Sequence, residues 1–122
     1  MMSETLRNFR NFFVKIQPNI YLEGQVPNGA EFPYATFTCC EGRFGEPVAA
    51  HVTGWYRSGS ANANAAAFLN AIAALVPESG VWLESPASKL LIHRATDFLT
   101  IVRDGDAIGG QARMEIRSYN AH

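Results

Sequence analysis

Hydrophobic positions in residues 60–76 recur three and four residues apart, which predicts an amphipathic helix. Its apolar residues are Ala65, Phe68, Leu69, Ile72, Leu75 and Val76. Ser60 is predicted to cap the N-terminus, because its hydroxyl can accept a bond from a first-turn amide. Pro77 ends the helix, since proline lacks an amide hydrogen. The other face carries alanine and asparagine without charge, so we expect it to lie smoothly against another surface.

A second helix is predicted over residues 3–16, where Leu6, Phe9, Phe13 and Ile16 share one face and Ser3 can cap the start. Strands are predicted where polar and apolar residues alternate or where short apolar runs lie between turns. The ranges are 34–40, 48–56, 81–84, 89–94, 98–103 and 111–119. The 98–103 run either continues the preceding strand or pairs beside it.

These elements predict a single α+β domain over residues 1–122, with an antiparallel or mixed sheet of about five strands. Both helices are expected on one face of the sheet, because a helix with one apolar stripe needs a surface to cover. The first two long strands should form an antiparallel hairpin, with residues 41–47 at its tip.

Residues 17–33 form a long connection, called the arm below, rich in proline and glycine. Residues 20–22 are expected to anchor it to the core or to form a short strand. Its later part offers a contact surface for another subunit through Gln25, Val26, Asn28 and Phe32. The alternative is an ordered loop that packs on its own subunit.

Composition excludes some function classes. The net charge of −1 gives no footprint for tight binding to nucleic acid or an anionic membrane. No apolar run approaches the ~20 residues of a membrane helix, and no signal-peptide core is visible, so we expect a cytosolic chain. Cys39 and Cys40 are neighbours, so a disulfide between them would be strained, and free thiols are expected.

The sequence matches a calcium-binding loop only in part. Asp104, Asp106, Gly109 and Glu115 match positions of a calcium-binding loop, but Ile108 stands where a carboxylate is needed. A plain hairpin turn explains the same residues.

Cys39 or Cys40 could form a nucleophile–base set only with His51 and an acid such as Asp97, and no motif links them. Phe37, Trp55 and Tyr56 could stack on bases, although on alternating strands such residues are more often core residues or edge cover. No zinc spacing, phosphate loop or glycosidase acid pair is present. We therefore predict no enzymatic activity, cofactor or metal.

Four segments carry a family resemblance: SETLRNFRNFFVKI, PYATFTC, GWYRSGS and RMEIRSY. In size, order of elements and texture the chain resembles the tail-terminator, or tail-completion, proteins of long-tailed bacteriophages, also called minor capsid or neck proteins. The resemblance covers nearly the whole chain. It implies a structural virion protein, assembled in the host cytoplasm, that forms a hexameric ring of copies of itself. Its partners would be the tail tube protein and the head connector protein, with genome DNA passing through the lumen.

A ring needs head-to-tail contacts that close by rotation. The arm and the last strand are expected to supply them. The loops 41–47 and 104–110 would then face the lumen or the adjoining ring, and their charged residues are Glu41, Arg43, Glu46, Asp104 and Asp106. The alternatives are a small cytosolic enzyme or ligand-binding α+β domain, which a pocket lined by His51 would favour, and a nucleic-acid module, which a basic face would favour.

Overall fold

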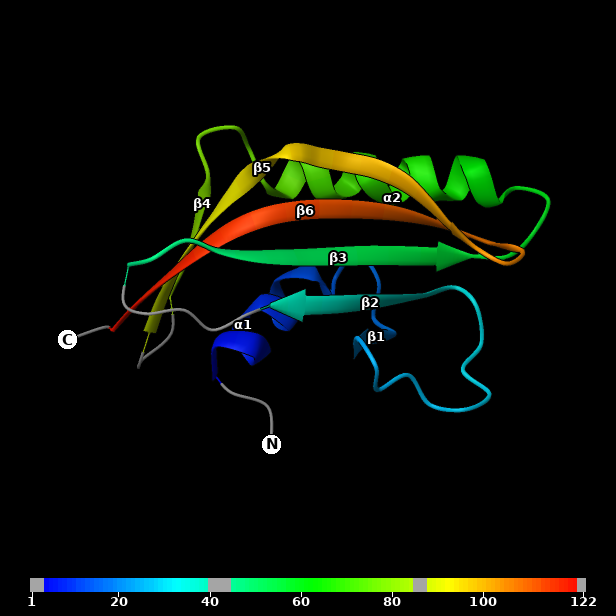
Figure 1. Cartoon of the computed structure of the whole chain (residues 1–122), viewed down its shortest axis with the longest axis horizontal. Coiled ribbons are helices and arrows are strands. Elements are labelled where there is room, and N and C mark those ends of the chain that lie inside the picture. Colours follow the sequence, from blue (N-terminus) through cyan, green and yellow to red (C-terminus); the bar gives the residue numbers. More distant parts are fainter. Residues whose placement is uncertain (1–3, 40–44, 85–87, 121–122) are drawn as a thin grey trace.

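The computed structural model describes residues 4–39, 45–84 and 88–120. It has two helices and a six-stranded mixed sheet, which confirms the predicted α+β fold with one more strand than expected (Figure 1). The helices are α1 (Glu4–Phe13) and α2 (Ala61–Leu75). The strands are β1 (Ile20–Leu22), β2 (Tyr34–Cys39), β3 (Val48–Tyr56), β4 (Val81–Glu84), β5 (Ser88–Asp104) and β6 (Ala107–Asn120).

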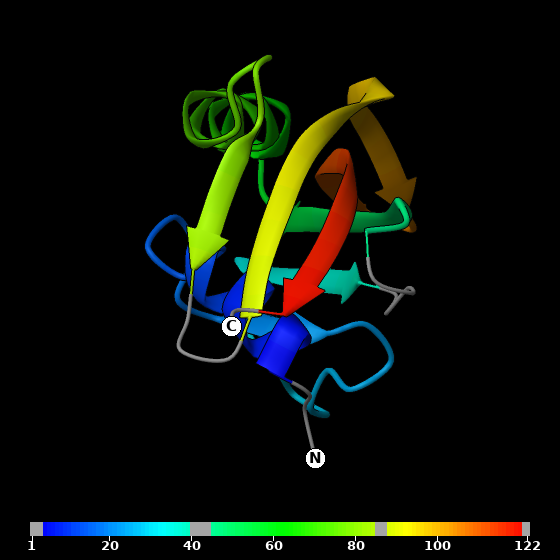
Figure 2. The ribbon, with the colours of Figure 1, turned by 90° about the vertical axis from the view of Figure 1, so that its left-hand side faces the viewer.

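The strands lie in the order β1-β2-β3-β6-β5-β4. Neighbours are antiparallel except β1 and β2, which are parallel, so the arm contributes the additional strand. The sheet is strongly twisted: in Figure 2, β4 and β5 run steeply across the view while β2 and β3 lie nearly horizontal. The last strand, β6, lies between β3 and β5, so both of its backbone edges are paired along most of its length.

The two predicted segments 89–94 and 98–103 form one continuous strand, β5. Its pairing with β6 shifts register between Arg94 and Leu99, which is where the sequence pattern is interrupted. A two-residue turn then joins β5 to β6, with Gly105 at φ +61°, a conformation that side chains with a Cβ disfavour.

Both helices cover the same face of the sheet. Phe9 and Phe13 of α1 pack edge to face and reach Phe37 of β2. Core side chains that α2 and the central strands contribute include Val52, Phe68, Ile72, Ala112, Met114 and Ile116. The predicted alternation in β6 is confirmed, because Ala112, Met114 and Ile116 are buried and Arg113 and Glu115 are exposed.

Two glycines allow α2 to approach the sheet closely. A Cβ at Gly110 of β6 would lie 2.7 Å from the carbonyl oxygen of Ala65. A Cβ at Gly54 of β3 would lie 2.7 Å from Cγ of Phe68. The helix therefore rests directly on backbone at these two points, and larger residues there would force it away from the sheet.

The ends of the helices differ in part from the sequence prediction. Ser60 precedes α2, but its hydroxyl makes no capping bond, because φ −101° and ψ 13° do not give the usual capping geometry. Its carbonyl instead accepts the amide of Asn64. Helix α1 ends at Phe13, three residues early, where the amides of Ile16 and Gln17 both bond to the Phe13 carbonyl. The predicted cap Ser3 lies outside the described residues.

Arg94 of β5 holds the C-terminal end of α2. Its Nε donates to the Val76 carbonyl at 2.7 Å and its Nη2 donates to the Ala73 carbonyl at 3.1 Å. The guanidinium also lies 4.6 Å from the centre of the Phe98 ring. The last carbonyls of a helix lack partners within the helix and carry partial negative charge, so this cation stabilises both the helix end and its contact with β5.

We predict that Gly110→Ala lowers the free energy of unfolding by about 1–3 kcal/mol, because the new Cβ meets backbone that cannot rotate away. Urea denaturation followed by circular dichroism measures the change. Gly59→Ala is the matched control, since a Cβ there has no neighbour within 4 Å. Equal effects of the two substitutions would contradict the close approach of α2.

We predict that Arg94→Met lowers the free energy of unfolding by about 1–3 kcal/mol, because two helix carbonyls lose their donor. The midpoint of thermal unfolding should fall accordingly. Arg103→Met, on the exposed distal part of the same strand, should stay within about 0.5 kcal/mol of the parent protein. An unchanged midpoint for the Arg94 variant would show that solvent replaces the guanidinium at no cost.

Candidate functional site

The sheet face opposite α1 and α2, called the open face below, carries a network of polar side chains. The indole Nε1 of Trp55 donates to Oγ1 of Thr36 at 3.2 Å, which joins β3 to β2. Nε2 of Gln111 donates to Oγ1 of Thr53 at 3.1 Å, which joins β6 to β3. Thr36 and Thr53 are buried although no helix covers them, because their neighbours on the open face enclose them.

The network extends along both sides of these strands. Arg113 donates to Oε1 of Gln111 at 2.9 Å and also pairs with Asp97 of β5. Nε2 of His51 lies 2.7 Å from Oε2 of Glu23, which ties the arm to β3. Polar groups on the open face therefore find partners on neighbouring segments, and the arm is held to the sheet by a charged contact.

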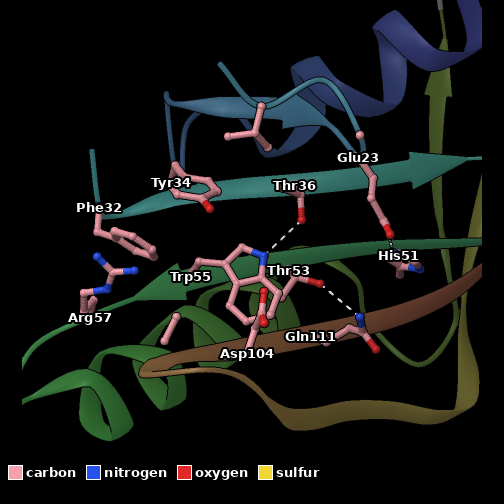
Figure 3. A pocket seen from close by; sticks show the side chains of 13 residues that line it. Glu23, Phe32, Tyr34, Thr36, His51, Thr53, Trp55, Arg57, Asp104 and Gln111 are labelled. Atoms are coloured by element: carbon pink, nitrogen blue, oxygen red, sulfur yellow. Dashed lines mark hydrogen bonds and ion pairs between the residues drawn. The ribbon is translucent and has the colours of Figure 1, made fainter. Parts of the chain in front are cut away.

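A cavity of about 360 Å³ lies over Trp55, between the arm and the β5–β6 hairpin (Figure 3). The arm supplies Glu23, Val26 and Phe32. The floor and the opposite wall are Tyr34, Thr36, His51, Thr53, Trp55, Arg57, Asp104, Ala107 and Gln111. Its size is at the lower end of the range for small-molecule sites. We call it the open-face cavity.

One end of the open-face cavity is closed by a stack of side chains. The Phe32 ring lies 5.0 Å from the Tyr34 ring, and the Arg57 guanidinium lies 4.4 Å from the centre of the Phe32 ring. Nε of Arg57 also pairs with Asp106 at 3.0 Å. The hairpin tip, the end of β3 and the arm are thus joined around one aromatic ring.

The predicted contact residues of the arm have different positions. Val26 and Phe32 line the open-face cavity within their own chain. The backbone amide of Gln25 donates to the Leu22 carbonyl, and Asn28 is exposed. The arm therefore packs on its own sheet at both ends, and the exposed stretch around Asn28 is the part available to another molecule.

The two loops expected to face a lumen lie at opposite ends of β3 (Figure 1). Asp104 lines the open-face cavity, and Asp106 pairs with Arg57. Glu46 is exposed at the start of β3, while Glu41 and Arg43 lie outside the described residues. The described residues of the two loops therefore do not form one continuous acidic surface.

The candidate nucleophile and base are separated by the sheet. Cys39 is buried and pairs with Ala50 on the face covered by the helices. His51 follows Ala50 and points to the open face, toward Glu23. Asp97 pairs with Arg113. The structure thus does not bring this thiol and imidazole together, and Cys40 lies outside the described residues.

The other candidate residues are also dispersed. Asp104 and Asp106 flank the hairpin turn, whereas Glu115 lies within β6 opposite His93. In the part of the chain that the structure describes, no group of three or more His, Cys, Asp or Glu side chains could hold a metal ion.

The three aromatic residues considered for base stacking do not form one surface. Phe37 is fully buried in the core, and Trp55 lies on the opposite, open face. Tyr56 packs on Phe68, and burial raises the pKa of its hydroxyl. Only Trp55 is placed to contact a ligand on the open face.

A second surface of interest lies beside α2. The exposed residues of this helix are Asn62, Ala63, Asn64, Ala66, Ala67, Asn70 and Ala74, and the helix carries no charge. Leu99 and Ile101 of β5 are 40% and 44% exposed and pair with Ala112 and Gly110 under the helix. The exposed residues of the helix together with these two side chains are called the helix-side surface below, and Arg103 follows Ile101 on the same face of β5.

The two edges of the sheet differ. The carbonyls of Ile20 and Leu22 in β1 point away from β2, and they accept bonds from Nε of Arg10 and the amide of Gln25. At the other edge, β4 pairs only with Lys89–Ile92. The distal part of β5, from Leu99 onward, therefore has a strand on one side only among the described residues.

Comparison with protein-family models and with curated protein sequences gives no match for this chain. Within the described ranges, neither helix is long and apolar enough to cross a membrane. The function therefore has to be argued from the surfaces themselves.

Sequence reasoning missed most residues of the open-face cavity. Thr36, Arg57 and Gln111 were not singled out, and Glu23 lies just before the arm residues that were. The available signal was the alternation of Tyr34, Thr36 and Thr38 in β2, which places polar side chains on one face. The pairing of β3 with β6 that completes the floor was not visible in the sequence.

We predict that Thr36→Val lowers the free energy of unfolding by about 1 kcal/mol, because the indole of Trp55 loses its acceptor. Urea denaturation measures this, and the indole N–H resonance should shift in an NMR spectrum. Thr38→Val, on the same strand and face, should change stability by less than about 0.5 kcal/mol. An unmoved indole resonance in the Thr36 variant would contradict the hydrogen bond.

Proposed function

We propose that this protein is a structural component of a virion, similar to phage tail terminators, that forms a ring of its own copies without catalysing a reaction. The ring would cap the tail tube and join it to the head connector, and the genome would pass through its lumen. The observation that carries this proposal is the helix-side surface. An uncharged helix with Leu99 and Ile101 exposed beside it is a surface that gains stability when another molecule covers it.

The edges of the sheet bear on how copies would meet. A head-to-tail ring built by extending the sheet needs two open edges, and β1 is occupied by Arg10 and the turn at Gln25. We therefore propose that side-chain surfaces make the contacts, with the helix-side surface of one copy against the exposed arm around Asn28 of the next.

The proposed lumen is lined by acidic residues that do not grip the DNA backbone, because like charges repel. Asp104 and Asp106 at the hairpin tip are candidates, and Glu46 lies at the other end of β3. Since the two loops lie at opposite ends of the sheet, one would face the lumen and the other an adjoining ring. Neutralising Asp104 and Asp106 should leave the mass of the ring unchanged if they line the lumen.

We predict a hexamer by native mass spectrometry, or a monomer that forms rings as concentration rises. Ile101→Glu should abolish the oligomer while the circular dichroism spectrum stays unchanged, because it places a charge in the helix-side surface. Thr96→Glu adds the same charge to the exposed bulge of the same strand and should preserve the ring. A monomer at every concentration would overturn the proposal.

A second candidate function is a small ligand-binding α+β domain. The specific observation in its favour is the open-face cavity, which is lined by His51 and by convergent polar and aromatic side chains. The thiol that an enzyme of the considered type would need is on the other side of the sheet. A bound small molecule together with a persistent monomer would favour this candidate over the ring.

A further inference from the structure

We propose that the open-face cavity binds an organic cation, specifically a guanidinium group of the arginine type. The lining residues that we assign to the site are Glu23 of the arm, Tyr34 of β2, Trp55 of β3 and Asp104 of the β5–β6 hairpin, and Figure 3 shows the Glu23 side chain directed to His51. This inference does not depend on the ring proposal, because a monomer has all four groups.

The hydrogen bonds of the cavity floor are formed within the protein, which leaves the carboxylate of Asp104 as an acceptor for a ligand. The indole N–H of Trp55 is used by Thr36, and the amide Nε2 of Gln111 is used by Thr53. These two donors of the floor therefore already have acceptors inside the protein. Asp104 lines the cavity and forms no ion pair with the residues that the structure describes. Guanidinium offers five donors and no acceptor, which complements such a site.

Charge favours the same ligand. Among the lining residues, Glu23 already contacts His51 at 2.7 Å, and Arg57 pairs with Asp106 outside the cavity. Asp104 remains as an uncompensated negative charge at the mouth. A cation that enters gains this attraction, whereas an anion would meet repulsion from it.

The protein itself shows a guanidinium on an aromatic ring beside the cavity. Arg57 lies 4.4 Å from the centre of the Phe32 ring, within the distance at which cations are attracted to aromatic faces. Phe32 is thereby occupied from within and Tyr34 packs on Phe32 and Tyr21, so Trp55 is the ring of the same wall that we assign to the ligand. The ligand would repeat next to Trp55 the contact that Arg57 makes with Phe32.

The cation has two possible sources with the same chemistry, a free small molecule or an arginine side chain of another polypeptide. The probe for both is N-acetyl-arginine amide, compared with the neutral N-acetyl-glutamine amide. Titration of the full chain should shift the Trp55 indole resonance saturably with the arginine probe only. If the probe also dissolves a concentration-dependent association of the protein, the natural source is a second copy.

Two substitutions should act in opposite directions. Asp104→Asn should weaken binding of the arginine probe about threefold to fivefold, because it removes the uncompensated carboxylate. Arg57→Gln should tighten binding about twofold or more, because it removes a positive charge from the wall and releases Asp106. Glu78→Gln removes the same charge as the first variant at an exposed site beyond α2, and should leave binding unchanged.

Equal responses to the arginine and glutamine probes would overturn the inference, since no cation would then be recognised. Equal weakening by Asp104→Asn and Glu78→Gln would also overturn it, since only net charge would matter. The dispersion of the amide spectrum checks that each variant is folded, and all the changed residues are exposed. The mass of the protein is measured separately, so loss of the ring proposal and loss of this one are distinct results.

Discussion

The contact between α2 and the backbone of β3 and β6 is the constraint on which the other features depend. Gly54 and Gly110 leave no room for a side chain, so Phe68 and the Ala65 carbonyl lie directly on the sheet. The large side chains of α2 are buried in this contact, and the exposed side of the helix carries alanine and asparagine. The small side chains on the exposed face of the helix and the close packing of its buried face therefore result from the same arrangement.

Coverage on one side determines the character of the other. With α1 and α2 on the same face, the open face has no helix to bury its side chains, and the strands carry polar and aromatic residues there. Thr36 accepts from Trp55 and Thr53 accepts from Gln111, so side-chain hydrogen bonds join three neighbouring strands. Such a network stiffens the floor, so that a ligand or a partner meets side chains already held in position.

The sequence predicted those features that depend on local periodicity. Alternation located β3 and β4 at their observed bounds and assigned the two faces of β6. Helical spacing located α2 within one residue at each end. The prediction of the helix cap from residue type was less reliable, because Ser60 is a typical capping residue but does not have the backbone angles of a cap.

Features that depend on distant segments were not predictable. The open-face cavity combines the arm, β3 and the β5–β6 hairpin, and their proximity follows from strand order alone. The two acidic loops seemed equivalent along the chain, yet β3 separates them by its full length. Cys39 and His51 are close in sequence, but the pleat directs them to opposite faces.

The unequal edges of the sheet also limit how this chain can misassemble. Arg10 and the turn at Gln25 occupy the outward carbonyls of β1, while distal β5 keeps its outer side free. A molecule with one accessible strand edge can form backbone hydrogen bonds with one neighbouring copy. After that, no unpaired edge is left for a further copy. Fibril growth needs an accessible strand edge on both sides of every unit, so a cross-β polymer would require the carbonyls of Ile20 and Leu22 to lose their present partners.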